Sequence, residues 1–253
     1  MTRSAAQRFS DTAAGYAATM APSVGHMARE VVRRAGLQSG ERVLDIGTGT
    51  GTAAAAARGE GREIVGVDAA PGMLEIARRE VDGVKFLEME MAALAFPDAT
   101  FDAVLSAHVL LFADDQRAAV TEWLRVTRPG GRMSLSVPGP EEASSRPIYG
   151  AIYERYGVGL SRRYPTAASL QEVLADAGWT DVRVEADPST AVFLSDEAQF
   201  RLWRNVGTQG ATAAELTPEQ HAALTEEMLA VTPRGEDGGF RIPFGTLYAT
   251  AVR

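Results

Sequence analysis

The chain has 253 residues, of which 45% are hydrophobic, and carries a formal net charge of −8 at pH 7. This length and apolar content predict one large domain, and the acidic balance disfavours a nucleic-acid surface, which needs a basic patch. The lack of cysteine excludes disulfides, thiolate metal sites and cysteine nucleophiles. Neither residues 1–10 nor any later run predicts a signal peptide or a membrane span. We therefore expect a cytoplasmic protein with no membrane association and no metal site.

Residues 1–36 precede the first predicted strand and carry bulky apolar groups such as Phe9, Tyr16 and Met20. They predict two short helices divided near Pro22. These apolar groups either pack on the sheet or face a ligand. Gly36 is the expected end of the second helix.

The stretch Val43–Gly51 reads VLDIGTGTG. Its apolar residues predict a buried strand of a parallel sheet, and the alanine-rich run 52–58 predicts a helix. The glycines permit a loop whose bare backbone approaches a small molecule, although a tight connection alone would use the same residues. A dinucleotide fingerprint needs a third glycine where Thr52 stands, and no P-loop lysine follows.

A second β-branched strand, Glu63–Asp68, ends in a carboxylate about 20 residues beyond the glycines. An acid at this position can accept hydrogen bonds from both ribose hydroxyls of a nucleoside that lies across the glycine loop. The alternative is a cap for the next helix, because Pro71 suits a first turn. The loop and the acid together favour nucleoside binding.

The pattern continues as alternating strands and helices up to residue 138. The expected segments are a helix at 71–80, strands at 84–88, 101–106 and 132–137, and a helix from Asp114 to Thr127 that ends at Arg128-Pro129-Gly130-Gly131.

Four blocks within this region resemble class I S-adenosylmethionine-dependent methyltransferases, in the branch with ubiquinone and menaquinone biosynthesis and many small-molecule methyltransferases. The blocks are VLDIGTGTG, GVDAAPGML at 66–74, LAFPDATFDAVLS at 94–106 and WLRVTRPGGRMSLSVP at 123–138. The resemblance implies an α/β fold: a doubly wound, Rossmann-like sheet of seven strands, the last antiparallel, with a helical cap. It also implies S-adenosylmethionine as the cofactor and a lid formed by residues 1–36.

The resemblance places the cofactor against the first loop and the strand ends. Asp45 is expected to hold the loop and the cofactor's ammonium end, and Asp68 to hold the ribose. Gly47 and Gly49 are expected to bring the backbone to the methionine part. Further cofactor contacts are expected at Thr48, Met73, Glu90, Met91 and Ser106.

Two of these expectations have an equal or near-equal structural alternative. In relatives the apolar residue at the position of Met73 lies against the adenine, but Met73 can equally be a core residue. Glu90 stands where the family usually has an aspartate that reads the adenine amino group, and it can equally be a solvated glutamate.

His108 follows the fourth strand, where family members present residues to the transferred methyl group and the acceptor. An imidazole with the reference pKa of about 6.5 could take a proton from a hydroxyl acceptor. The family often has a histidine further along, where this chain has Leu111. His108 is thus the candidate catalytic residue, with pocket lining or packing as the alternative.

After residue 138 the family's core is interrupted. The cap is expected at 139–165 and 188–240, with helices at 196–206 and 218–229, a flexible link at 207–214 and a loop at 233–239. A core helix at 167–177 and strands at 179–185 and 244–252 complete the sheet. The expected acceptor-site residues are Tyr16, Met20, His108, Tyr149 and Tyr153.

These features predict a single methyltransferase domain, 1–253, that moves a methyl group to a small organic acceptor by O-, N- or C-methylation. Catalysis is expected mainly from proximity and orientation. Two alternatives stay open, a cofactor-binding protein of this fold that does not methylate and a NAD-dependent oxidoreductase. The insertion could also form the interface of a homodimer.

Overall fold

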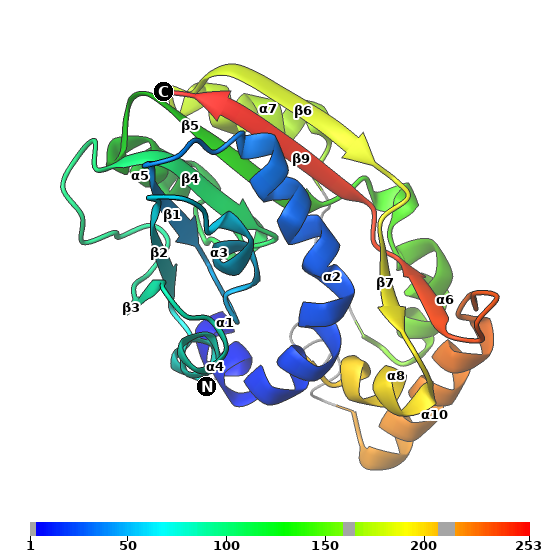
Figure 1. Cartoon of the computed structure of the whole chain (residues 1–253). Helices are drawn as coiled ribbons and strands as arrows, with labels where there is room; N and C mark the ends of the chain where they lie inside the picture. Colours follow the sequence, from blue (N-terminus) through cyan, green and yellow to red (C-terminus); the bar gives the residue numbers. More distant parts are fainter. Residues whose placement is uncertain (1–3, 159–164, 207–215) are drawn as a thin grey trace.

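The computed structural model describes residues 4–158, 165–206 and 216–253. Its centre is a seven-stranded sheet of order β3-β2-β1-β4-β5-β9-β6 (Figure 1). Strands β1 to β5 are parallel, and β9 runs antiparallel to both β5 and β6. This confirms the predicted sheet with its antiparallel last strand. The strands are β1 (Arg42–Ile46), β2 (Glu63–Asp68), β3 (Lys85–Glu88), β4 (Phe101–Ala107), β5 (Thr127–Pro138), β6 (Thr180–Asp187) and β9 (Thr246–Val252).

Helices cover both faces of the sheet (Figure 1). One face carries α2 (Ala13–Ala35), α3 (Thr52–Ala57) and α4 (Pro71–Glu80), and the other carries α5 (Gln116–Val126) and α7 (Ala167–Asp176). Helix α5 begins slightly later than predicted, because the side chain of Asp115 caps it by accepting a hydrogen bond from the Ala118 N–H at 2.9 Å.

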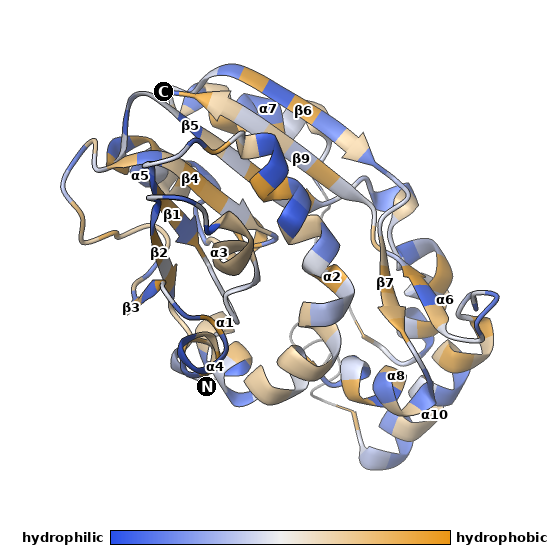
Figure 2. Cartoon of the chain, viewed as in Figure 1, coloured by the Kyte–Doolittle hydropathy of each residue, from blue (hydrophilic) through white to orange (hydrophobic). Residues whose placement is uncertain are grey.

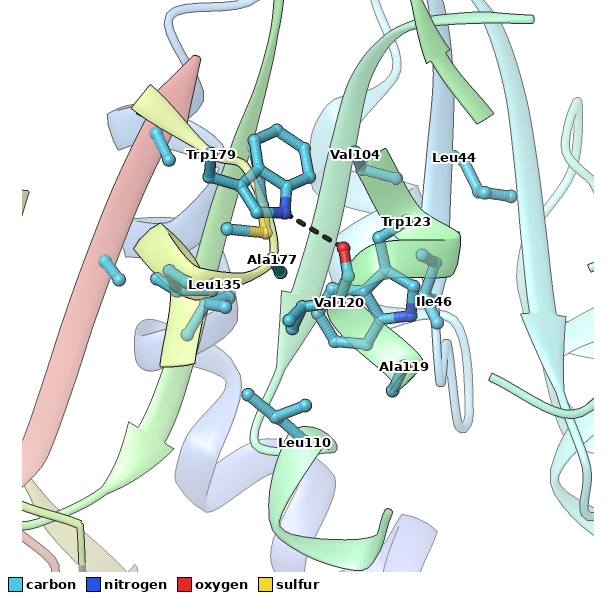
Figure 3. Close-up of a cluster of buried hydrophobic side chains, with 14 of the residues drawn as sticks. Leu44, Ile46, Val104, Leu110, Ala119, Val120, Trp123, Leu135, Ala177 and Trp179 are labelled. Atoms are coloured by element: carbon cyan, nitrogen blue, oxygen red, sulfur yellow. Dashed lines mark hydrogen bonds between the residues drawn. The ribbon is translucent and has the colours of Figure 1, made fainter. Parts of the chain in front are cut away.

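The main core lies between the sheet and α5 and α7 (Figure 3). Trp123 and Trp179 fill it, and the indole N–H of Trp179 donates to the carbonyl of Val120 at 2.9 Å, so the buried ring leaves no polar group unpaired. Hydrophobic residues follow the central strands, whereas the edge strand β6 alternates in hydropathy (Figure 2). This difference is expected, since central parallel strands are covered on both faces.

The N-terminal segment does not divide at Pro22 as predicted. Helix α1 (Ala5–Asp11) ends at Thr12, and α2 runs through Pro22 to Gly36. A proline removes only one backbone donor from a helix, and residues of α2 on both sides of Pro22 are buried against the rest of the protein. Thr19 donates to the Gly15 carbonyl at 2.8 Å, and Ser23 donates to the Thr19 carbonyl at 2.6 Å.

The predicted cap ranges pack on one another in the structure. Helix α6 (Arg146–Arg155), α8 (Glu197–Arg204) and α10 (Pro218–Val231) share a buried cluster and lie beyond α2 from strands β1 to β3 (Figure 1). The cap also contains a two-stranded ribbon, β7 (Ala191–Leu194) with β8 (Phe240–Pro243), which was not predicted. The predicted link at 207–214 lies outside the described residues. Short 3₁₀ turns are η1 (Leu110–Phe112) and η2 (Glu141–Ala143).

Among the described helices, none combines the length and the apolar composition that crossing a bilayer requires.

Candidate functional site

A cavity of about 710 Å³ opens at the carboxyl ends of the central parallel strands. This is where open α/β sheets bind ligands, since the strand order reverses between β1 and β4. One part of the lining comes from the loops after β1, β2 and β3, and we call it the cofactor end. The other part comes from α2, the cap and the segment after β4, and we call it the cap end.

The glycine loop after β1 forms one wall of the cofactor end, and its glycines serve different purposes. Gly47 has φ +67°, and a Cβ added there would lie 2.3 Å from a methyl of Val109. Gly49 has φ +55° but faces open space, with no atom within 4 Å of such a Cβ. Gly47 therefore permits close packing on the segment after β4, and Gly49 leaves its backbone open to the cavity.

Asp45 lies behind this loop, outside the cavity lining. Its Oδ2 accepts hydrogen bonds from the hydroxyl of Thr48 at 2.7 Å and from the Ala54 N–H at 3.0 Å. Its Oδ1 is buried and has no hydrogen-bond partner among the described residues. Burial raises the pKa of Asp45 to about 6, although the two hydrogen bonds oppose that rise. An unpartnered buried carboxylate oxygen is costly, and a ligand cation nearby would offset the cost.

Asp68, at the end of β2, faces the cavity. Its two oxygens each accept one backbone bond, Oδ2 from the Gly49 N–H at 2.8 Å and Oδ1 from the Ala70 N–H at 2.9 Å. The carboxylate thus joins the glycine loop to the start of α4, and lone pairs remain for a ligand. Burial raises the pKa of Asp68, and the charge of Glu90 adds to the effect. The predicted cap role is not what the structure shows, since Asp68 bonds the N–H of Ala70, the N-cap residue of α4, and no described side chain caps that helix. The predicted ribose contact stays a prediction.

The structure brings most of the other predicted cofactor residues to the same end. Met73 lines the cavity although it is almost fully buried, so packing and ligand contact are compatible. Glu90 and Met91 line it from the segment after β3. Thr48 is a buried residue of the loop itself, and the buried hydroxyl of Ser106 on β4 has no hydrogen-bond partner among the described residues. Neither residue belongs to the lining.

The N-terminal helices contribute residues to the lining of the cofactor end. The ring of Phe9 on α1 meets that of Phe112 edge to face at 5.0 Å, and Ser10 accepts a hydrogen bond from the Gly72 N–H at 2.9 Å. Tyr16 on α2 lines the cavity near Asp68. Burial raises the pKa of Tyr16 to about 12, and the charge of Asp68 contributes to this rise. Tyr16 therefore lies nearer the cofactor end than the sequence suggested.

The cap end is built from aromatic and aliphatic side chains that are far apart in the sequence. Met20, His108, Trp203 and Phe244 line it. His108 stacks on Phe244, with ring centroids 5.2 Å apart and an angle of 28° between the planes.

Tyr149 and Tyr153 lie elsewhere. They are buried in the cap's own core, where the hydroxyl of Tyr149 bonds that of Thr232 at 2.7 Å, and neither lines the cavity.

Sequence reasoning missed Phe112, Trp203 and Phe244 as cavity residues. Each is an isolated aromatic residue in a helix, turn or strand end, so no local motif distinguishes it from a core residue. The tertiary fold alone brings them together.

The charge of the cavity is one-sided. Its described lining contains the acids Asp68, Glu90 and Asp114 and no lysine or arginine. Such a site favours a cationic or neutral ligand over an anionic one. S-adenosylmethionine, whose sulfonium and ammonium groups outweigh its carboxylate and leave a net positive charge, fits this charge and the unpartnered oxygen of Asp45. The fold and the site together define a Rossmann-like enzyme that binds this cofactor.

Comparison with known proteins identifies the class. Residues 44–135 match the family model described as a methyltransferase domain. A demethylmenaquinone methyltransferase from Renibacterium salmoninarum is 32% identical over 172 residues, 61% of this chain and 73% of the relative. A malonyl-[acyl-carrier protein] O-methyltransferase from Serratia marcescens is 36% identical over 133 residues, 52% of this chain and 51% of the relative.

Among solved structures, a methyltransferase in complex with the Trm112 methyltransferase activator of Haloferax volcanii is similar over 97% of this chain and 95% of its own, with a TM-score of 0.64 and 25% identity. The chain belongs to the class I S-adenosylmethionine-dependent methyltransferases, in the branch that acts on small molecules. It is an enzyme that transfers a methyl group from S-adenosylmethionine to a small-molecule acceptor.

Proposed function

We propose that the acceptor is a neutral, aromatic small molecule that binds at the cap end of the cavity. The observation that carries this proposal is the cap-end wall of Met20, Trp203, Phe244 and His108, with no lysine or arginine among its described residues. An acceptor with a carboxylate would find no basic side chain among the described lining residues to neutralise it, which is unfavourable. The reaction named for the Renibacterium salmoninarum relative uses demethylmenaquinone, so a reduced naphthoquinone is the first acceptor to test.

The cofactor end would hold S-adenosylmethionine through the residues described above. Asp68 would accept hydrogen bonds from the ribose hydroxyls, the Gly49 backbone would meet the methionine part, and the Asp45 charge would act on the ammonium. Met73 and Glu90 would lie at the adenine. The cofactor supplies an electrophilic methyl group on a sulfonium.

The chain's own contribution to catalysis is orientation and exclusion of water. Helix α1 and Phe112 cover the cofactor end through the Phe9 contact, and the cap covers the other. An acceptor held against the cap-end wall would approach the methyl group from the side opposite the sulfur, as in-line displacement requires.

A screen that measures cofactor consumption and product mass tests this proposal. Reduced naphthoquinols that lack the ring methyl would be compared with phenols, amines and carboxylate acceptors of similar size, with Asp68→Ala as the cofactor-site control. We expect methylated product from neutral aromatic acceptors and little from carboxylates. Preferential methylation of carboxylates would contradict the acceptor class. Cofactor binding by calorimetry without transfer to any acceptor would favour a non-methylating protein of this fold.

The net charge also bears on the kind of partner that the protein binds. The net charge of −8 supports a small-molecule acceptor over a nucleic acid. A homodimer stays a prediction, and light scattering at micromolar concentration tests it.

A further inference from the structure

The side chain of His108 is held at both ring nitrogens. Nδ1 lies 2.8 Å from the hydroxyl of Ser136 on β5, and Nε2 lies 3.4 Å from the hydroxyl of Thr246 on β9. The backbone of His108 is held as well, since its N–H donates to the Ser136 carbonyl at 2.9 Å. Its φ is +61°, in the left-handed region. A neutral imidazole has one donor and one acceptor nitrogen, so it can satisfy both hydroxyls at once. Neither nitrogen is left over for an acceptor molecule.

Thr246 connects His108 to the segment at the base of the cap. It is fully buried, and its hydroxyl lies 3.0 Å from that of Thr190 and 3.1 Å from the Phe244 carbonyl. The Thr190 hydroxyl in turn donates to the same carbonyl at 2.8 Å, and the Phe244 N–H donates to the Thr190 carbonyl at 3.0 Å. The backbone of Phe244 is therefore fixed by two threonines, one of which also contacts His108.

The ring of Phe244 is fixed by His108. The two rings stack at 5.2 Å, and Phe244 also packs on the cap cluster. Both rings line the cavity. The orientation of the Phe244 ring therefore depends on that of the imidazole. The two hydroxyls in turn determine the orientation of the imidazole.

The surroundings of His108 keep it uncharged. Burial lowers the pKa of His108 to about 3, and the charge of His26 on α2 contributes to this fall. The groups that face it from β5 and β9 are hydroxyls, α2 also contributes the thioether of Met27 beside Thr246, and Phe244 contributes a ring. An uncharged wall would avoid repelling the sulfonium of a bound cofactor.

We propose that His108 is a positioning residue: its imidazole, held between Ser136 and Thr246, sets the ring of Phe244 as one wall of the acceptor pocket and takes no proton from the acceptor. The part that concerns acceptor binding rests on the proposed function, and the held imidazole does not. This differs from the general-base role that the sequence suggested, and the two roles predict opposite results for the same variants.

The held imidazole is tested by NMR without any acceptor. The chain has three histidines, so ¹⁵N-labelled histidine gives three ring systems, and His108→Asn identifies the signals of His108. We expect His108 to stay neutral and in one tautomer from pH 5 to pH 8. In Thr246→Val one hydroxyl is lost, and we expect a mixture of tautomers, whereas Thr246→Ser restores the single form. Titration of His108 in wild type with a midpoint between pH 6 and 7, or a tautomer mixture, would overturn the proposal.

Kinetics on an acceptor from the screen distinguishes a positioning role of His108 from a general-base role. His108→Phe keeps a ring against Phe244 but has no nitrogen. A positioning role predicts a kcat within about tenfold of wild type, whereas loss of a general base costs about 10²–10⁴-fold. For Phe244→Leu and Thr246→Val we expect KM for the acceptor to rise about 3- to 10-fold with the cofactor Kd unchanged.

A fall of kcat by more than 10² in His108→Phe, with the variant folded and binding cofactor, would refute the positioning role. If no acceptor in the screen is methylated, the proposed function fails and the NMR result alone decides the state of His108.

Discussion

Asp45 gives the most quantitative prediction, through the perturbation Asp45→Asn. Burial raises the pKa of this carboxyl from its ordinary 3.8 to about 6. The folded state therefore keeps a proton that the unfolded state releases between these pH values. Because the folded state binds more protons, the free energy of unfolding falls as pH rises through this window. A change from 3.8 to about 6 corresponds to about 3 kcal/mol at 1.36 kcal/mol for each pH unit.

The assay is urea unfolding of the wild type and Asp45→Asn from pH 4.5 to pH 7.5, without ligand. An asparagine cannot titrate, so this contribution disappears. From pH 4.5 to pH 7.5, we expect the unfolding free energy of Asp45→Asn to rise by about 2 kcal/mol relative to that of the wild type. Asp82→Asn is the matched control, since Asp82 is exposed. The difference for this control should stay constant.

The ligand arm of the experiment uses S-adenosylhomocysteine, which carries the same ammonium without the sulfonium. If the ammonium lies near the unpartnered Oδ1, it stabilises the ionised carboxyl, and saturating ligand should remove most of the pH dependence. A flat difference between wild type and Asp45→Asn without ligand would refute the burial argument. A pH dependence that the ligand leaves intact would remove Asp45 from the ammonium site.

Three further predictions follow from the same cavity. Asp68→Ala should weaken cofactor binding by about 2–4 kcal/mol in calorimetry, because a charged acceptor of hydrogen bonds is lost; an unchanged Kd in a folded variant would exclude Asp68 from the site. Gly47→Ala should lower stability by about 2–5 kcal/mol, from the clash with Val109 and the left-handed backbone, and Val109→Ala should restore part of it; Gly49→Ala, with open space, should cost less stability and more cofactor affinity. Hydrogen exchange in α1, the first half of α2, α8 and α10 should slow when cofactor and acceptor bind; equal protection in both states would identify a fixed element.

The sequence predicted the cofactor end because its determinants are local. The glycine loop directly follows β1, and Asp68 ends the next strand, so strand polarity alone brings them together. Strand and helix periods near them are clear, and α4 and β2 occupy the predicted residues. The glycines were foreseen as a group, but their separate duties were not. The clash that makes Gly47 necessary involves Val109, a residue of another strand end.

The errors have physical causes that short-range patterns do not reveal. Pro22 predicted a helix break, but α2 continues because buried residues on both sides of it, among them Thr19 and Met27, pack on the rest of the protein. The ribbon β7–β8 was missed because each strand has four residues and its partner is distant in the chain. Tyr149 was expected in the acceptor site because it lies in the insertion that was predicted to form the cap, yet its hydroxyl bonds Thr232 inside the cap.

This division between the two ends of the cavity also determines what can be transferred from relatives. The family match covers residues 44–135, which contain the cofactor end, whereas Met20, Trp203 and Phe244 of the cap end lie outside it. Relatives of this chain are named for different acceptors, demethylmenaquinone and a malonyl-[acyl-carrier protein]. Cofactor chemistry can therefore be inferred from the match, but acceptor choice must be argued from the cap end. There the decisive facts are an uncharged wall and an imidazole whose two nitrogens are already engaged.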